Sequence, residues 1–275
     1  MTRLFCVSLF VVAFALVVTQ PSAQAPERRD AYDEILDLNV RDGMVYYRAL
    51  KGSRGRLDTF VNALAGRSID AATRNEQIAF WLNAYNAIVL QTVVDNYPIP
   101  LRSRDYPAGS IRQVPGAFER LTHRVAGRTV TLDQIEQTIL AGYDDPRLFF
   151  ALGRGAMGSG RLHSAAYTAA TLEQQLTEVA TECVTRVQCV DVDRLESVVK
   201  VSAIFSWREK EFTAAYADKA PALFASRSPI ERGALAFVYP RLLTTEREFL
   251  ESNTFRVRFS PFDWSLNDLT GRGGR

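Results

Sequence analysis

The sequence predicts a single helix-rich α+β domain packed around a small, partly antiparallel sheet. Helix-start signals recur along the chain, whereas β-branched or alternating runs typical of strands are short and few. Regular alternation of strands and helices, which would indicate the βαβ units of a parallel sheet, is missing, and no fixed-period repeat is visible. These observations favour helices arranged about a minor sheet.

The clearest helix prediction covers residues 73–95. It opens on Thr73-Arg74-Asn75-Glu76, a capping box in which the threonine and glutamate side chains satisfy free amide groups of the first turn. Apolar residues then recur at three- and four-residue spacings, and Asn96-Tyr97-Pro98 ends the helix.

Other helices open on similar signals. Capping-box patterns predict helices over residues 131–140 and 171–183. Ser228, followed by Pro229 at the first helical position, opens another, because the missing amide of proline costs nothing there.

The predicted strands are short. Residues 123–126 and 128–131 form a predicted hairpin around Gly127, and residues 148–152 are predicted to be a short buried strand. Residues 187–192 and 256–259 alternate or are β-branched, so they complete the predicted set of strands.

Residues 1–25 are interpreted as a secretory signal peptide. Arg3 precedes an apolar run over residues 4–18, and Ala23-Gln24-Ala25 forms a small-residue cleavage site. The alternative is a membrane anchor, but the apolar run ends before the roughly 20 residues that a span needs. We therefore expect export to the periplasm or the medium, with no stable membrane insertion after cleavage.

The remaining chain is expected to form one unit. We predict a lead-in helix over residues 26–41, the domain over residues 42–268 and a disordered tail over residues 269–275.

The 33 basic and 31 acidic side chains give a formal net charge of +2. Such a balance provides no electrostatic footprint for nucleic acid, so we expect no nucleic-acid partner.

Export would place the cysteines in an oxidising compartment. Cys183 and Cys189 lie six residues apart, after the signal peptide, and are predicted to form a disulfide. The two histidines, His123 and His163, have no metal-like spacing to these cysteines. We therefore predict no metal site.

Six ordered motifs span most of the predicted domain. They are residues 79–87 (AFWLNAYNA), 132–140 (LDQIEQTIL), 145–152 (DPRLFFAL), 167–168 (YT), 201–207 (VSAIFSW) and 262–267 (FDWSLN). Together they resemble the uncharacterised family catalogued as domain of unknown function 547. The resemblance implies a shared fold and no particular activity.

The chain departs from that family at three positions. Many members carry two cysteines just after the segment 145–152, where this chain has Arg154 and Ser159. Gln137 stands where many relatives have a histidine. The resemblance therefore carries neither cysteine-based nor histidine-based chemistry at these positions to this chain.

Asn83 and Asn86 are candidate ligand-binding residues. They lie three residues apart on one face of the predicted helix, where two carboxamides can present donors and acceptors to a ligand or an oxyanion. The favoured alternative is that both satisfy buried backbone groups of an adjoining loop.

Glu136 is a candidate general base. It lies beside core-facing Ile135 and Ile139, and burial would raise its pKa. The structural alternative is a salt bridge to Arg147 or Arg154.

The glycine-rich run 153–160 contains the pattern G-x-G-x-x-G but prolongs a loop instead of opening a helix, so we predict no dinucleotide cofactor and no other cofactor. Its amides, with Arg154 and Arg161, are candidates for binding a small anionic ligand or peptide. The alternative is a tight turn whose arginines are solvated or paired.

Ser159 and His163 form a close serine and histidine pair, although the nucleophile elbow G-x-S-x-G is incomplete.

The leading hypothesis is an exported ligand- or anion-binding, or catalytically degenerate, domain. Its expected polar cleft draws on five side chains: Asn83, Asn86, Glu136, Arg154 and His163. The alternatives are a hydrolase or acyl transferase with Glu136 or His163 as base, and a structural or partner-binding protein marked by an exposed apolar patch.

Overall fold

The computed structural model describes residues 31–270. The predicted signal peptide, the first residues of the lead-in helix (26–30) and most of the predicted tail (271–275) lie outside the described residues. The α-helices are α1 (Ala31–Asn39), α2 (Tyr47–Gly52), α3 (Gly55–Ala63), α4 (Arg74–Asn96), α5 (Leu132–Gln134), α6 (Leu172–Val184), α7 (Ala203–Trp207), α8 (Glu209–Tyr216), α9 (Pro229–Val238) and α10 (Thr244–Glu251).

The strands form three small sheets in the described part of the chain. Their bounds are β1 (Val40–Arg41), β2 (Met44–Val45), β3 (His123–Val125), β4 (Arg128–Val130), β5 (Val190–Asp193), β6 (Val198–Ser202) and β7 (Arg256–Ser260). β1 pairs with β2 and β3 with β4 as antiparallel hairpins. In the third sheet β6 is central, antiparallel to β5 and parallel to β7. The predicted helix-rich α+β class with a partly antiparallel sheet is confirmed.

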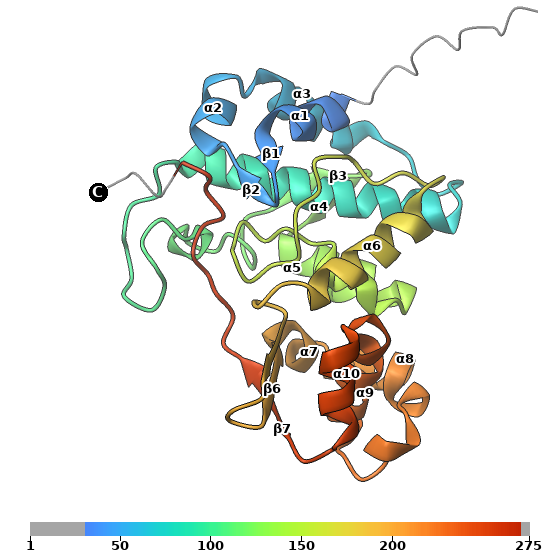
Figure 1. Cartoon of the computed structure of the whole chain (residues 1–275). Helices are drawn as coiled ribbons and strands as arrows, with labels where there is room; N and C mark the ends of the chain where they lie inside the picture. The colour runs from blue at the N-terminus through green and yellow to red at the C-terminus, as the bar shows by residue number, and fades with distance from the viewer. Residues whose placement is uncertain (1–30, 271–275) are drawn as a thin grey trace, which may run out of the picture.

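Helix α4 is the central element of the larger, upper part of the molecule, while α7 to α10 form the lower part (Figure 1). Its predicted capping box is present: the amide of Thr73 donates to Glu76 Oε2 over 2.7 Å, and the amide of Glu76 donates to Thr73 Oγ1 over 3.4 Å. Trp81, Tyr85 and most other side chains of α4 are buried around its circumference, as expected of a helix enclosed by other elements.

The C-terminal segment ties the two parts together. After β7 the chain runs back from the lower part to the upper part (Figure 1). There the amide of Val45 donates to the carbonyl of Asn267 over 2.8 Å, and the amide of Leu269 donates to Val45 over 2.9 Å. The hydroxyl of Tyr47 donates to Asn267 Oδ1 over 2.8 Å. These bonds hold the chain after β7 beside β2.

Two predicted elements differ from the structure. Residues 148–152, expected to be a strand, lie in the 3-10 helix η5 (Pro146–Phe150) and the residues after it. The cause is local: Pro146 has the backbone angle of a first helical turn, and the side chain of Asp145 accepts the amide of Arg147 over 3.0 Å. The helix predicted over 131–140 begins as α5 but continues as a π-helix, η3 (Ile135–Leu140).

Strand β6 was not predicted, and the strand predicted over 187–192 begins only at Val190. The predicted hairpin around Gly127 is present. Among the described residues, no helix is both long enough and apolar enough to cross a membrane.

Gly160 lies against the end of η5, and a Cβ atom at this position would meet the carbonyl oxygen of Phe150 at 1.6 Å. We therefore expect Gly160→Ala to lower the free energy of unfolding by roughly 3 kcal/mol or more, because backbone atoms must move. Gly142→Ala is the control, since a Cβ there meets nothing within 4 Å. Urea unfolding of both variants tests this, and an equal, small effect would contradict it.

Candidate functional site

A buried carboxylate organises the candidate site. Glu136, on η3, is 5 % exposed, and Arg154 and Arg208 beside it are 2 % and 3 % exposed. Arg154 donates from Nη2 to Glu136 Oε1 over 2.7 Å and from Nε to Oε2 over 3.1 Å. Arg208 donates from Nη2 to Oε1 over 2.9 Å, and the hydroxyl of Tyr85 donates to Oε2 over 3.1 Å. We call Glu136, Arg154, Arg208 and Tyr85 the charge hub.

The hub fixes the protonation state of Glu136. Burial alone would raise the pKa of Glu136, but the charges and hydrogen bonds of Arg154 and Arg208 hold it below its ordinary value. Each carboxylate oxygen accepts two hydrogen bonds, so no lone pair is left to receive a proton. The expected high pKa is therefore wrong, and the geometry does not favour a general base here.

The alternative proposed for Glu136, a salt bridge, is present with Arg154. Arg147 instead pairs with Asp145 and Glu173, at 2.7 and 2.6 Å. Because all its charge is directed to Glu136 and its Nη1 donates to backbone carbonyls, Arg154 offers no free cation to an anionic ligand. That expectation for Arg154 is corrected by its burial.

An open pocket of about 220 Å³ lies over the charge hub. Glu136 and Arg154 contribute to its lining, together with Gln137 from η3. Aromatic side chains form its wall: Phe118, Trp207 and Trp264. Phe262 packs behind this wall, with ring centroids 4.8 Å from Trp207 and 4.5 Å from Trp264. We call this hollow the aromatic pocket.

Arg112 lies against the aromatic wall. Its guanidinium carbon is 4.9 Å from the ring centroid of Trp264 and 5.3 Å from that of Phe118, which is cation–π geometry. Its Nη1 pairs with Glu119. Its Nε is buried and has no hydrogen-bond partner among the described residues. This N–H is therefore an unsatisfied buried donor beside the aromatic pocket.

Two further carboxyl groups line the aromatic pocket and titrate in opposite directions. Burial and the nearby charges of Glu119 and Glu136 raise the pKa of Asp133. Burial also acts to raise the pKa of Glu119, but its hydrogen bond to Arg112 holds it below the ordinary value. Sequence reasoning missed Asp133, whose one signal is its position in the first turn of a capped helix.

The two asparagines hold loops. Asn83 donates from Nδ2 to the carbonyl of Tyr167 over 2.8 Å and accepts the amide of Tyr167 over 2.9 Å. Asn86 donates to the carbonyl of Ala151 over 3.1 Å and accepts the amide of Gly153 over 2.8 Å. Both carboxamides thus satisfy backbone groups, which is the alternative favoured from the sequence, and neither lines the aromatic pocket.

The remaining predicted site residues lie elsewhere. Ser159 is buried and its Oγ accepts the amide of Arg154 over 2.9 Å. His163 Nε2 lies 3.1 Å from Glu182 Oε2, and Arg161 pairs with Glu182 over 3.0 Å. The expected single cleft therefore divides: Glu136 and Arg154 border the aromatic pocket, whereas Arg161 and His163 gather around Glu182.

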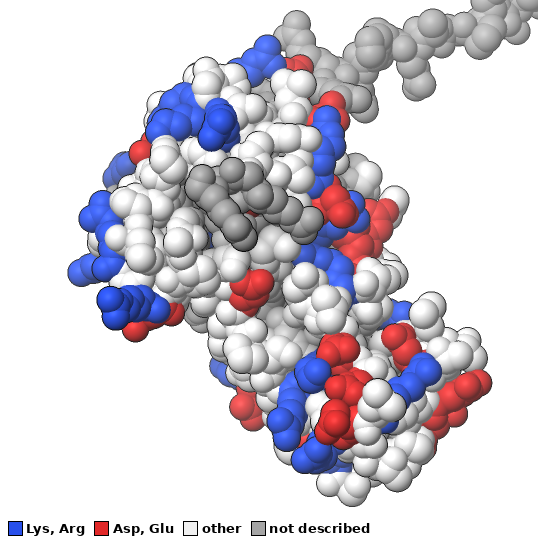
Figure 2. Space-filling model, turned by 60° about the vertical axis from the view of Figure 1, so that its left-hand side comes forward, with Lys and Arg blue, Asp and Glu red and all other residues white. Residues whose placement is uncertain are grey.

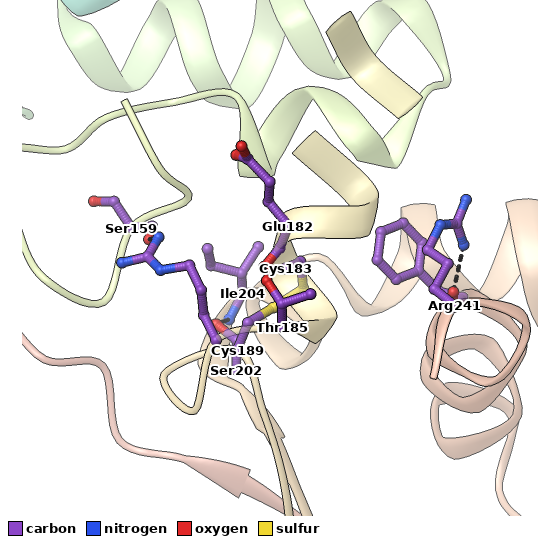
Figure 3. Close-up of a disulfide and its surroundings, with 10 residues drawn as sticks. Ser159, Glu182, Cys183, Thr185, Cys189, Ser202, Ile204 and Arg241 are labelled. Atoms are coloured by element: carbon purple, nitrogen blue, oxygen red, sulfur yellow. Dashed lines mark hydrogen bonds between the residues drawn. A yellow bond between two sulfur atoms is a disulfide. The ribbon is translucent and has the colours of Figure 1, made fainter. Parts of the chain in front are cut away.

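Cys183 and Cys189 form a disulfide with Cα atoms 5.3 Å apart, joining the end of α6 to the start of β5 (Figure 3). Across residues 31–270, no group of three or more His, Cys, Asp or Glu side chains is arranged to hold a metal ion.

The match to known families falls on the segment that builds the charge hub. Residues 69–184 match the family described as protein of unknown function, DUF547. This finding confirms the resemblance and covers α4, Glu136 and Arg154. No curated protein and no solved structure matches the chain.

Trp207, Arg208 and Trp264 lie outside the DUF547 match and were not among the site residues predicted from sequence. Trp207 and Trp264 do belong to the quoted motifs VSAIFSW and FDWSLN. Clustering of aromatic residues in those motifs was the available signal.

Glu136→Gln removes the charge that compensates two buried guanidinium groups. Breaking a buried ion pair from one side costs about 3–5 kcal/mol, and we expect a loss of that order in the free energy of unfolding. Glu248→Gln, at an exposed position, is the matched control and should change little. Denaturant unfolding at neutral pH measures both.

The advantage of the wild type over Glu136→Gln should also depend on pH. Because the folded-state pKa of Glu136 is lowered, this stability is complete above its unfolded value of about 4.3 and is lost as pH falls through the lower folded-state value. A difference between the two proteins that stays constant from pH 7 to pH 3 would contradict the role of an ionised Glu136.

Proposed function

We propose that this protein is an exported ligand-binding module whose ligand occupies the aromatic pocket. The ligand is a compact molecule with a flat apolar face and several hydrogen-bonding groups, as found in a sugar ring. The observation that carries the proposal is the position of Trp207, which lines the pocket and is 46 % exposed.

The shape of the pocket supports a ligand of this kind. Small-molecule sites are concave, have aromatic and apolar walls and contain a few fixed polar groups. Volumes of about 300–1,000 Å³ are typical for drug-sized ligands. The aromatic pocket, at about 220 Å³, suits a single ring unit better than an extended molecule.

The polar groups of the pocket suit hydroxyl groups. Gln137 offers both a carbonyl oxygen and an amide, and Asp133 and Glu119 offer carboxyl groups. A sugar hydroxyl both donates and accepts, so it can bond to each of these groups. A purely apolar ligand would leave them without partners at a cost in free energy.

A non-catalytic role is favoured by two of the three residues at which this chain departs from many DUF547 proteins. Gln137 and Arg154 both line the aromatic pocket. They stand where many DUF547 proteins carry a histidine and a cysteine. Neither a primary amide nor a buried, ion-paired guanidinium can act as a nucleophile or as a base at neutral pH.

Export is supported by the N-terminal residue pattern and by the disulfide. The apolar run and small-residue site within residues 1–25 are typical of a signal peptide. A structural disulfide persists in oxidising compartments outside the cytosol.

One observation favours a second candidate function, a hydrolase. A pocket holding one carboxyl of raised pKa, Asp133, and one of lowered pKa, Glu119, separates a proton donor from an ionised group. In this case Asp133→Asn would abolish turnover of a bound substrate while binding persists. Release of product by the wild type but not by this variant distinguishes the hydrolase from the binding module.

Binding to the aromatic pocket is tested by titrating a panel of monosaccharides and short glycans while following tryptophan fluorescence. Trp207→Ala removes both the stacking face and the apolar area that it buries, so we expect about tenfold weaker binding, since a stacked aromatic pair contributes about 0.5–1.5 kcal/mol beyond its buried area. Trp207→Phe keeps an aromatic face and should retain most of the affinity.

Leu195→Ala is the control, since Leu195 is 97 % exposed and does not line the aromatic pocket. It should bind as the wild type does. Equal affinities in the wild type and Trp207→Ala, for a ligand that does bind, would overturn the assignment of the pocket.

A further inference from the structure

A second hollow lies away from the aromatic pocket. It is a groove of about 870 Å³ between the β1–β2 hairpin and the end of α6. Three arginines line it, namely Arg41, Arg161 and Arg186, against the two carboxylates Asp42 and Glu182. We call it the arginine groove.

Arg186 is a half-buried cation that forms no ion pair within the described residues 31–270. Its Nη1 donates to the carbonyl of Ser159 over 3.1 Å and its Nη2 to that of Met157 over 3.5 Å. Burial lowers the pKa of Arg186 by more than the nearby carboxylates Asp42 and Glu182 raise it.

Arg161 can exchange one of its ion pairs for a contact with a ligand that Arg186 binds. It pairs with Asp42 over 2.6 Å and with Glu182 over 3.0 Å. The side chain of Asp42 is 84 % exposed, so this pair is worth little and can exchange for a ligand oxygen. Arg41, on the opposite wall, is exposed and donates to the backbone carbonyl of Val40 over 2.6 Å.

The disulfide fixes the position of Arg186. Cys183 and Cys189 close the short loop that carries it, and Figure 3 shows the disulfide below the side chain of Glu182. Within the loop the amide of Arg186 donates to Cys183 over 3.2 Å, and the amide of Cys189 donates to Arg186 over 2.8 Å. The guanidinium is therefore presented to the groove by a covalently closed turn, without a large entropic cost on binding.

We propose that the arginine groove binds an oxyanion, a carboxylate or phosphate group, with Arg186 as its principal partner and Arg161 and Arg41 beside it. A guanidinium offers five N–H donors in a planar fork that matches two oxygens of such a group. Backbone carbonyls take only part of this capacity on Arg186. The groove is larger than a free phosphate needs, so the oxyanion can belong to a larger molecule.

This site is independent of the proposed function, because no residue lines both hollows. It also differs from the expectation drawn from the sequence. There, Arg154 and Arg161 were to hold the anion, whereas Arg154 is committed to Glu136. Arg186, which the sequence did not single out, takes its place.

Binding is tested by thermal unfolding and isothermal titration of the disulfide-intact protein with inorganic phosphate, sulfate and succinate at constant ionic strength. We expect saturable binding to the wild type and at least about tenfold weaker binding to Arg186→Gln. Arg124→Gln, on the exposed β3–β4 hairpin, is the matched control and should bind as the wild type does. Preference for succinate over phosphate, or the reverse, identifies the source of the oxyanion.

Phosphate and sulfate also stabilise proteins by exclusion from the surface, but that effect acts equally on all variants and does not saturate. Equal shifts in the three proteins, or no saturation, would overturn the proposal. Arg41→Gln provides a second test if Arg186→Gln does not fold, because Arg41 is exposed. It should weaken binding severalfold, and wild-type affinity in Arg41→Gln would then sink the proposal.

Discussion

The fold depends on the neutralisation of one buried carboxylate. Glu136, Arg154 and Arg208 are each at least 95 % buried, and an unpaired charge at such a depth would cost several kcal/mol. Their pairing joins three stretches of chain: the π-helix η3, the glycine-rich loop and the junction of α7 with α8. Since α7 and α8 belong to the lower part of the molecule (Figure 1), the charge hub also fastens the two parts together. This anchoring places Trp207, next to Arg208 in the chain, in the wall of the pocket that Gln137 also lines.

The face shown in Figure 2 carries no patch of a single charge sign that spans the molecule. On the face shown in Figure 2, acidic and basic side chains lie interspersed. Charges that neighbouring residues hold in place line both hollows. The two hollows differ in their charges: Glu136 under the aromatic pocket is paired with Arg154 and Arg208, whereas Arg186 in the arginine groove forms no ion pair within the described residues. The former suits a neutral polar ligand and the latter an anion.

The sequence predicted the features that depend on interactions between residues close together in the chain. The capping box of α4, the hairpin around Gly127 and the close cysteine pair each depend on residues a few positions apart. The prediction failed where distant residues decide. The salt bridge of Glu136 to Arg154 was open as an alternative from the sequence, but Arg208, 72 positions from Glu136, was not foreseen as a second partner. The strand predicted over 148–152 was wrong for a different reason. Asp145 caps a helical turn that begins at Pro146, and this local signal decides the structure although the residues that follow are apolar.

The glycine-rich loop is the link between the two hollows. Its first part contributes Arg154 to the charge hub, and Arg161, directly after its last residue, lines the arginine groove. Between them, Gly158 donates its amide to Asp263 over 2.8 Å, and Gly160 lies directly against the carbonyl of Phe150. A loop fixed at both points has little freedom to open or close over a ligand. It therefore acts as a rigid partition that sets the geometry of both hollows, and a ligand in either one would meet a site already formed.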